Sequence, residues 1–364
     1  MVSRINKKTL LIIGGLAVLA IVSPVLFLAT QQRQNLQEHA AGPAVSPLIF
    51  GTNLTLNDAN DQFINSQATR NALASMHVQL IRMPIRNAGG PTPWEVQAMQ
   101  DIHAMGVTPI IILKYSQTDP LGAGQQVLTQ ATSIFGSQRI YVEFGNERDL
   151  AGVNQTAYTT AWNQVIPQLK TQFPTAMFMG PVNFQQNPTY IASFIHNATP
   201  KPDAISWHEY ICGNSSPASY CIAHIANWGT HIANTKAAIQ ANGDTVPPIF
   251  ITEWNYDPNN PSPDPRVTPQ FQDTFTRTAL QELANDGVTG ATQYVATGHT
   301  EYNLIDPGGN PTAEGQAFSQ MYTQLITAQG GQGNTSPSLP TMTPTPIVTV
   351  TPIPTQPLAW VEQH

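Results

Sequence analysis

Short apolar runs alternate with longer amphipathic stretches along residues 47–328. The runs are rich in β-branched and aromatic residues, which favours strands, whereas the stretches between them place apolar residues at helical spacing. Two of these stretches, 92–106 and 268–287, are predicted helices, and Gly106 and Gly287 stand where a helix end favours a left-handed residue. The runs predict eight strands, at 48–54, 78–84, 107–113, 139–145, 176–182, 204–210, 248–254 and 288–295.

A strand followed by a helix, repeated along the chain, is typical of a parallel sheet covered by helices. Eight such units predict a single (β/α)8 barrel over residues 41–328. The alternative is a doubly wound open sheet, which usually carries a glycine-rich phosphate loop after its first strand. The segment GTNLTLNDAN at 51–60 contains no such loop, so the pattern favours the barrel.

The N-terminal segment has the pattern of a targeting sequence. Arg4, Lys7 and Lys8 precede an apolar run over 10–29, and about 20 apolar residues can cross a bilayer. Basic residues before the run keep the N-terminus cytoplasmic. We therefore expect residues 1–40 to be a signal anchor with a linker, with a cleaved signal peptide as the alternative and a buried core helix as a third. The first two place the barrel outside the cytoplasm, anchored to the membrane or secreted.

The other end of the chain also differs from the barrel region. From about Gln329 onward, threonine and proline alternate, which favours an extended stalk that buries little surface. Residues 329–364 are therefore predicted to be a disordered tail. Cys212 and Cys221 enclose a short segment of turn composition, and in an oxidising compartment we expect a disulfide between them rather than free thiols.

Composition narrows the classes of function. The chain has 364 residues and a formal net charge of −7, which disfavours a nucleic-acid-binding protein. The hydrophobic content of 41% excludes global disorder, and two cysteines exclude a cysteine-rich scaffold. The nine histidines form no HxH or HExxH motif, so no metal site is predicted, nor any cofactor.

Polar residues gather at the ends of the predicted strands, where (β/α)8 barrels carry their function. Any one of these residues could be a solvated charge in a loop. Two glutamates together with several hydrogen-bonding residues at the same edge of the barrel are less expected by chance. A pair of carboxylates suits glycoside hydrolysis, in which one is protonated and the other ionised. These strand-end residues are Arg82, Asn146, Glu147, His208, Glu209, Tyr210, Glu253 and Trp254.

Four short motifs resemble those of clan A glycoside hydrolases, with families 39, 79 and 5 as possible relatives. They are LIRMP (80–84), VEFGNE (142–147), WHEY (207–210) and FITEWN (250–255). The resemblance implies hydrolysis with retention through a covalent glycosyl-enzyme, with Glu147 as the general acid/base and Glu253 as the nucleophile. It also implies that Asn146 binds the sugar 2-hydroxyl, and that Arg82 and Tyr210 orient Glu253 and lower its pKa.

Neighbouring positions extend this picture. His208 and Tyr210 are two residues apart on one strand and share a face, so Glu209 should point away from the site. Glu143, four residues before Glu147 on a predicted strand, should face the same side, and we hypothesise that it forms a buried ion pair with Arg82.

Aromatic residues are expected to stack on sugar rings. We expect Trp254 and Tyr294 to contact the sugar; the clan's usual strand-eight tryptophan is absent, and Tyr294, His299 and Tyr302 are the candidates to replace it. Tyr115 and Trp228 are further candidates, whereas core packing is favoured for Trp207.

Taken together, these features predict an extracytoplasmic retaining glycoside hydrolase that acts on a polysaccharide or oligosaccharide with β-linkages, or on β-glycosides. A carbohydrate-binding cell-surface protein without activity is a second hypothesis, and the presence of both glutamates argues against it. A third is a hydrolase that uses His208 and a metal, for which the sequence shows no recognisable ligand set.

Overall fold

The computed structural model describes residues 45–327, apart from 88, 116–117, 214, 258–263 and 300. The predicted signal anchor or signal peptide at 1–40 and the predicted tail at 329–364 lie outside these residues. Within the described part of the chain, no helix combines the length and apolar character needed to cross a membrane.

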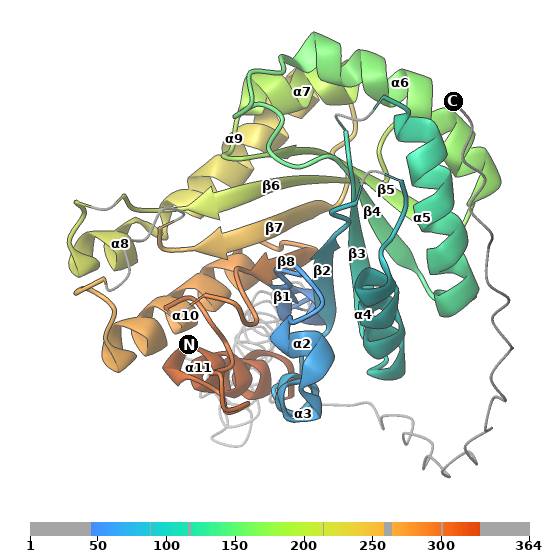
Figure 1. Cartoon of the computed structure of the whole chain (residues 1–364). Coiled ribbons are helices and arrows are strands. Elements are labelled where there is room, and N and C mark those ends of the chain that lie inside the picture. Colours follow the sequence, from blue (N-terminus) through green and yellow to red (C-terminus); the bar gives the residue numbers. More distant parts are fainter. Residues whose placement is uncertain are drawn as a thin grey trace, which may run out of the picture. The chain divides into compact units, whose positions relative to one another are not determined.

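Eight parallel strands form a closed barrel in which each strand pairs with its neighbours in sequence, and β1 also pairs with β8 (Figure 1). All eight predicted strands are found, and the open-sheet alternative is excluded because the barrel is closed. The strands are β1 (Gly51–Asn53), β2 (Leu80–Pro84), β3 (Thr108–Leu113), β4 (Ile140–Phe144), β5 (Ala176–Asn183), β6 (Ala204–Tyr210), β7 (Ile249–Asn255) and β8 (Gly290–Gln293).

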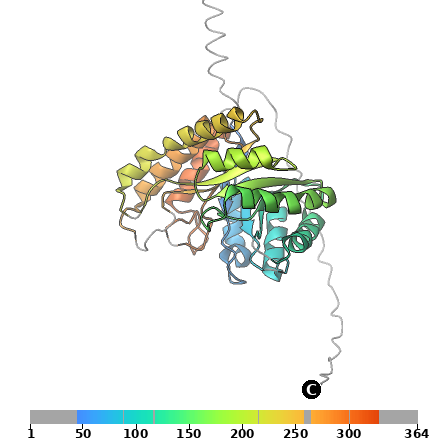
Figure 2. The ribbon, with the colours of Figure 1, turned by 90° about the horizontal axis from the view of Figure 1, so that it is seen from above.

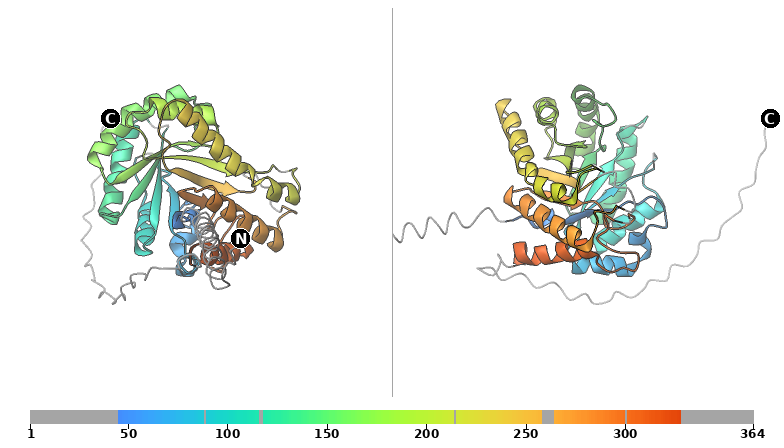
Figure 3. Two further views of the ribbon diagram at one scale, coloured as in Figure 1. Left: turned by 180° about the vertical axis from the view of Figure 1, so that it is seen from behind. Right: turned by 90° about the vertical axis from the view of Figure 1, so that its left-hand side faces the viewer.

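Helices follow the strands and lie outside them in every view (Figure 2, Figure 3). Most begin at a side chain that caps the first turn; Thr92 and Glu95, for example, form a reciprocal capping box at α4. The predicted helices at 92–106 and 268–287 are α4 and α10. The α-helices are α2 (Gln62–Asn65), α3 (Gln67–Ser75), α4 (Pro93–Ala104), α5 (Pro120–Phe135), α6 (Gln155–Gln172), α7 (Pro188–Asn197), α8 (Ala218–His224), α9 (Asn227–Ala241), α10 (Pro269–Asn285) and α11 (Ala313–Tyr322). Two further turns are the 3-10 helix η1 (Pro47–Ile49) and the π-helix η2 (Thr323–Thr327).

The barrel interior has an apolar floor and a polar upper half. The floor is a buried cluster from the N-terminal parts of the strands, in which the rings of Tyr141 and Phe250 lie 4.8 Å apart. A Cβ atom at Gly290 would lie 2.3 Å from the Phe250 ring, so this position requires glycine. Because side chains on a strand alternate, Arg82 and Glu143 face the interior two residues beyond Leu80 and Tyr141 of the floor. Charged groups therefore gather above an apolar plug.

The predicted disulfide between Cys212 and Cys221 is present, with the two Cα atoms 5.4 Å apart. It closes the segment between β6 and α8. The guanidinium of Arg266, from the connection between β7 and α10, donates to the carbonyl oxygens of Gly213 and Ser216 and forms ion pairs with Asp257 and Asp264. These bonds join the disulfide loop to the loop that follows β7.

Candidate active site

A cavity of about 1360 Å³ opens at the C-terminal ends of the strands. This is the edge where side chains from different strands converge in (β/α)8 barrels. Six of the predicted site residues line it, namely Arg82, Asn146, Glu147, Tyr210, Glu253 and Tyr294. His208 lies behind this surface, fully buried, and contacts two of them.

Glu253 stands near the end of β7 with both carboxylate oxygens engaged. Its Oε1 accepts a hydrogen bond from Arg82 Nη1 at 2.6 Å, and its Oε2 accepts one from the Tyr210 hydroxyl at 2.7 Å. Burial alone would raise the pKa of Glu253, but the neighbouring His208 ring, the positive charge of Arg82 and the two hydrogen bonds together outweigh it. The pKa of Glu253 is therefore lowered, and the carboxylate is ionised at neutral pH.

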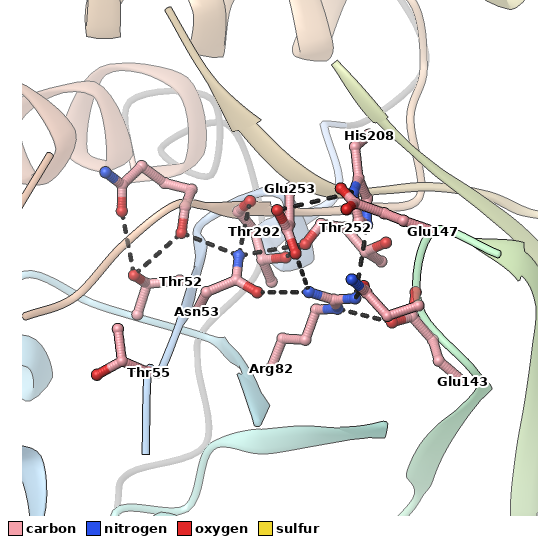
Figure 4. Close-up of polar contacts among 12 residues, drawn as sticks. Thr52, Asn53, Thr55, Arg82, Glu143, Glu147, His208, Thr252, Glu253 and Thr292 are labelled. Carbon is pink, nitrogen blue, oxygen red and sulfur yellow. Dashed lines mark hydrogen bonds and ion pairs between the residues drawn. The ribbon is translucent and has the colours of Figure 1, made fainter. Parts of the chain in front are cut away.

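Arg82 lies between two buried carboxylates (Figure 4). Its Nε donates to Glu143 Oε2 at 2.6 Å, which confirms the hypothesised buried ion pair, and its Nη1 donates to Glu253 and to Asn53 Oδ1. Burial by itself would lower the pKa of Arg82. The two carboxylates raise it by more than burial lowers it, so the guanidinium stays charged. One cation thus serves two carboxylates and fixes the position of Glu253.

The chain turns sharply just before Glu147. β4 ends at Phe144, Gly145 has φ +91°, and Glu147 itself has φ +47°. A Cβ atom at Gly145 would lie 2.9 Å from Tyr115 Cβ, so a larger residue would collide there. Glu147 is therefore not on a regular continuation of β4, as the four-residue spacing from Glu143 had suggested. A non-glycine residue in the left-handed region is uncommon and tends to occur at functional sites.

His208 connects the two glutamates. Its Nδ1 lies 2.8 Å from Glu147 Oε1 and 3.6 Å from Glu253 Oε2. Its Nε2 lies 3.5 Å from Arg82 Nη2, which can only donate, so Nε2 is the acceptor and Nδ1 carries the proton that is donated to Glu147. The pairing of β6 with β7 has a register shift between Trp207 and His208, so His208 lies at an irregularity in the sheet.

The two carboxyl groups face one another across a short gap. One carboxylate oxygen of Glu147 and one of Glu253 lie within 4.8 Å of each other and of a His208 ring nitrogen. Their surroundings differ, because the Glu253 side chain is 11% exposed and held by Arg82, whereas that of Glu147 is 21% exposed. Asn146 accepts from Arg82 Nη2 through its Oδ1, and its side chain is exposed to the cavity.

These three residues also have the donor atoms of a small cation site. However, both oxygens of Glu253 are already occupied, one of them by a guanidinium that would repel a metal ion at close range. The geometry therefore suits a carboxylate positioned by hydrogen bonds better than it suits a metal ligand.

The structure does not bring Trp254 to the cavity, which corrects the expectation that it contacts the sugar. Trp254 is fully buried and packs against Trp228 of α9, with their ring centroids 6.2 Å apart. The reason is strand alternation: Glu253 faces the interior, so the next residue faces the helices. Trp228 is likewise in the outer core, as is Trp207, for which core packing was favoured.

Glu209 points away from the site, as expected. It is fully buried, accepts a hydrogen bond from Trp207 Nε1 at 2.7 Å, and lies 3.0 Å from His231 Nδ1 of α9. Burial raises the pKa of Glu209, although His231 and Trp207 partly offset this effect. Glu209 therefore belongs to the layer between the barrel and the helices.

The walls of the cavity carry aromatic rings. Tyr294, His299 and Tyr115 line it, whereas Tyr302 is buried behind them, with its ring 6.4 Å from that of Tyr294. Phe184, which follows β5, also lines the cavity, and its ring stacks on Tyr210 at 6.2 Å. Burial raises the pKa of Tyr294 and lowers that of His299.

Sequence reasoning missed several residues that line the cavity: Asn53, Arg86, Lys114, Arg148 and Phe184. All five lie at or just beyond the C-terminal end of a strand, so the criterion that found Glu147 could have found them. Asn53, in particular, ends β1 and accepts from Arg82. They were passed over because none is part of a recognised motif.

No protein-family model matches the chain, and no curated protein does so either. Solved structures do resemble it. A family 51 α-L-arabinofuranosidase from Bifidobacterium longum has 15% sequence identity and a TM-score of 0.57, over 77% of this chain and 74% of that one. A 4-O-α-L-rhamnosyl-β-D-glucuronidase from Fusarium oxysporum has 13% identity and a TM-score of 0.58, over 78% and 70%.

A monomeric β-xylosidase from Caulobacter crescentus is similar to the same degree, with 13% identity and a TM-score of 0.58 over 77% of this chain and 69% of that one. At these identities the likeness is one of fold. It agrees with the motif resemblance to clan A glycoside hydrolases, since the three proteins named here have the names of glycosidases.

Proposed function

We propose that this protein is a retaining glycoside hydrolase that cleaves β-linked glycans or glycosides by double displacement. The observation that carries the proposal is the pair of carboxylates within 4.8 Å of each other, held in different surroundings. Retaining enzymes place their two carboxyl groups about 5–5.5 Å apart, whereas inverting enzymes leave about 6.5–9.5 Å for a water molecule. The names of the structurally similar proteins support a carbohydrate substrate.

In this proposal Glu253 attacks the anomeric carbon, because it is ionised and both its oxygens are positioned by hydrogen bonds. Glu147 protonates the departing oxygen and then accepts a proton from the water that hydrolyses the glycosyl-enzyme. His208 Nδ1 orients Glu147. Asn146 is placed to bind a sugar hydroxyl, and the ring faces of Tyr294 and Phe184 offer surfaces on which a sugar can stack.

The test is a hydrolysis screen with aryl β-glycosides and β-glucans, using the wild type, Glu147→Gln and Glu253→Gln. Glu209→Gln is a matched control, because Glu209 is a buried glutamate outside the cavity. We expect Glu253→Gln to lose activity on every substrate. Glu147→Gln should lose activity on natural glycans but still release an activated aryl leaving group, which needs no protonation.

The stereochemistry of the first product, followed by proton NMR, tests retention separately. A product of inverted configuration would contradict the double displacement. Full activity in both active-site variants would contradict the assignment of the two glutamates. A wild type that binds glycans without cleaving any of them would identify a binding protein instead.

We also propose that the barrel acts outside the cytoplasm, attached through an N-terminal anchor or released after cleavage. The disulfide between Cys212 and Cys221 supports this location, because disulfides persist in oxidising compartments. Protease treatment of intact cells that express the full chain is the test. Digestion of the barrel would support an outward location, and protection that ends only on cell lysis would contradict it.

A further inference from the structure

The cavity carries more positive charge than the proposed reaction uses. Lys and Arg number only 15 in this acidic chain, yet four of them line the cavity. Arg82 is committed to Glu143 and Glu253. The other three, Arg86, Lys114 and Arg148, follow β2, β3 and β4, which are neighbours in the barrel. We call them the cationic wall.

In the described part of the chain, no carboxylate lies within 4.0 Å of a side-chain nitrogen of the cationic wall. The nearby acids have other partners. Glu95 accepts from the Arg86 backbone N–H and from Thr92, and Asp119, which lines the cavity, caps α5 through the Gly122 N–H. The charges of the wall are therefore left without an acidic side chain in direct contact.

The wall is nevertheless held in place by neutral groups. The Arg86 guanidinium donates to the Thr55 carbonyl oxygen, and Lys114 Nζ donates to the Arg86 carbonyl oxygen. The Arg148 guanidinium lies 5.0 Å from the Tyr115 ring centroid, and its Nε is buried without a hydrogen-bond partner. These contacts orient the cations without neutralising them. A buried N–H with no partner is costly, so the hydrogen-bonding capacity of Arg148 is not fully used by its protein neighbours.

The opposite wall is different. From β5 onward the described cavity residues are Phe184, Tyr210, Glu253, Tyr294 and His299, a set that contains no lysine or arginine. A substrate in the cavity would thus meet aromatic and carboxylate groups on one side and cations on the other.

We infer that the substrate is an acidic glycan, whose carboxylate or sulfate group binds the cationic wall beside the carboxylate pair. The inference rests on the proposed glycosidase function and narrows its substrate class. Guanidinium groups bind planar and tetrahedral oxyanions through paired hydrogen bonds, and an uncompensated positive wall in a partly enclosed cavity raises the local concentration of anions. A uronic acid and a sulfated sugar both supply this oxyanion.

The experiment compares kcat/KM of the full chain on three matched sets of oligosaccharides: neutral, uronic-acid-containing and sulfated. The double variant Arg86→Gln/Lys114→Gln removes two charges of the wall. Arg86→Lys/Lys114→Arg keeps them, and Arg139→Gln, an exposed arginine at the other end of the barrel, is the control for net charge. The readout is the ratio of kcat/KM for acidic over neutral substrates, which is insensitive to a general loss of active protein.

The wild type is expected to prefer one acidic set, and which of the two it prefers identifies the oxyanion. In Arg86→Gln/Lys114→Gln that ratio should fall by about tenfold or more, because the oxyanion loses charge-assisted hydrogen bonds from both side chains. Arg86→Lys/Lys114→Arg should keep most of the ratio, and Arg139→Gln all of it. The preference should also weaken at high salt.

A wild type that cleaves neutral glycans as well as acidic ones would overturn the inference and leave the proposed function standing. An acidic preference that survives in the Gln double variant would overturn it too. If no glycan is cleaved, the proposed function fails, and the same comparison is made by equilibrium binding of the oligosaccharides. A binding preference for acidic ones that the Gln double variant loses would still support the cationic wall, and its absence would overturn it.

Discussion

Removing the Tyr210 hydroxyl measures how much its hydrogen bond contributes to keeping Glu253 ionised. In Tyr210→Phe, Glu253 Oε2 loses its 2.7 Å donor, while Oε1 keeps Arg82 at 2.6 Å. His208 Nδ1 lies 3.6 Å from Oε2 and already donates to Glu147 at 2.8 Å, so it cannot replace the hydroxyl without giving up that bond. The ring itself is retained, and the packing on Phe184 with it.

The size of the effect follows from the charge of the acceptor. A hydrogen bond to a charged group contributes about 1.5–3 kcal/mol, and this one favours the ionised form of Glu253. The pKa of Glu253 should therefore rise in the variant. The acidic limb of the pH profile is the range in which kcat/KM rises as Glu253 becomes ionised. At pH values below this limb, kcat/KM of the variant should be about tenfold to a hundredfold lower than that of the wild type, because each 1.4 kcal/mol is about a factor of ten. Above the limb, where Glu253 is ionised in both proteins, the loss should be much smaller.

The free energy of unfolding should also depend on the ionisation of Glu253. The pKa of Glu253 in the folded protein is lowered, so its contribution is present above the pKa of the unfolded chain and is lost as the pH falls through the folded value. Tyr210→Phe should therefore cost about 1.5–3 kcal/mol of unfolding free energy at neutral pH and less in acid. Urea unfolding at both pH values measures this difference.

Tyr190→Phe is the matched control, because the Tyr190 hydroxyl donates to a backbone carbonyl, that of Val153, rather than to a catalytic carboxylate. It should lower stability equally at both pH values and leave the acidic limb unmoved. The reasoning about Tyr210 would be refuted if its limb also stayed in place, or if the two variants gave the same pH profile.

Three further outcomes are expected. Arg82→Met should lower the unfolding free energy at neutral pH by about 3–5 kcal/mol in urea unfolding, because two buried carboxylates lose their shared cation; a change below about 1 kcal/mol would show that they are not both ionised. Burial raises the pKa of Glu314 to about 8, so stability should fall as the pH rises from about 4.5 to about 8. Glu314→Gln should remove that fall. In denaturation experiments, the free energy of unfolding of the variant should exceed that of the wild type by up to about 5 kcal/mol at a pH of about 8 and differ little at about pH 4. Cys212→Ser/Cys221→Ser should lose about 2–3 kcal/mol in oxidising buffer but match the wild type in reducing buffer, and equal thermal stability in oxidising buffer would contradict a stabilising disulfide.

The fold and much of the site could be predicted because they depend on local patterns. Strand positions follow from short apolar runs, and the residues that end those runs meet at one edge of a closed barrel. This pattern predicts Arg82, Glu147, Tyr210 and Glu253 at the site. The pairing of Glu143 with Arg82 followed from alternation along two strands.

The rest of the site could not be predicted, because it depends on the direction in which side chains face and on irregular backbone at the ends of strands. The sequence predicts Trp254 at the site because it is an aromatic residue at the end of a predicted strand, but a residue that follows Glu253 on a strand faces the opposite side. Glu147 reaches the site through a left-handed turn after Gly145 rather than as a continuation of β4. Its contact with His208 also accompanies a register shift between β6 and β7.

The sequence by itself determined the order of strands and helices and the kinds of residue at each strand end, since periodicity and turn chemistry act over a few residues. Only the tertiary structure decided that Arg82 serves two carboxylates at once and that Glu147 approaches Glu253 to within 4.8 Å. Only it placed Arg86, Lys114 and Arg148 along one wall of one cavity. The physical reason is barrel closure, which sets distances between residues that are far apart in the chain, and no local pattern encodes those distances.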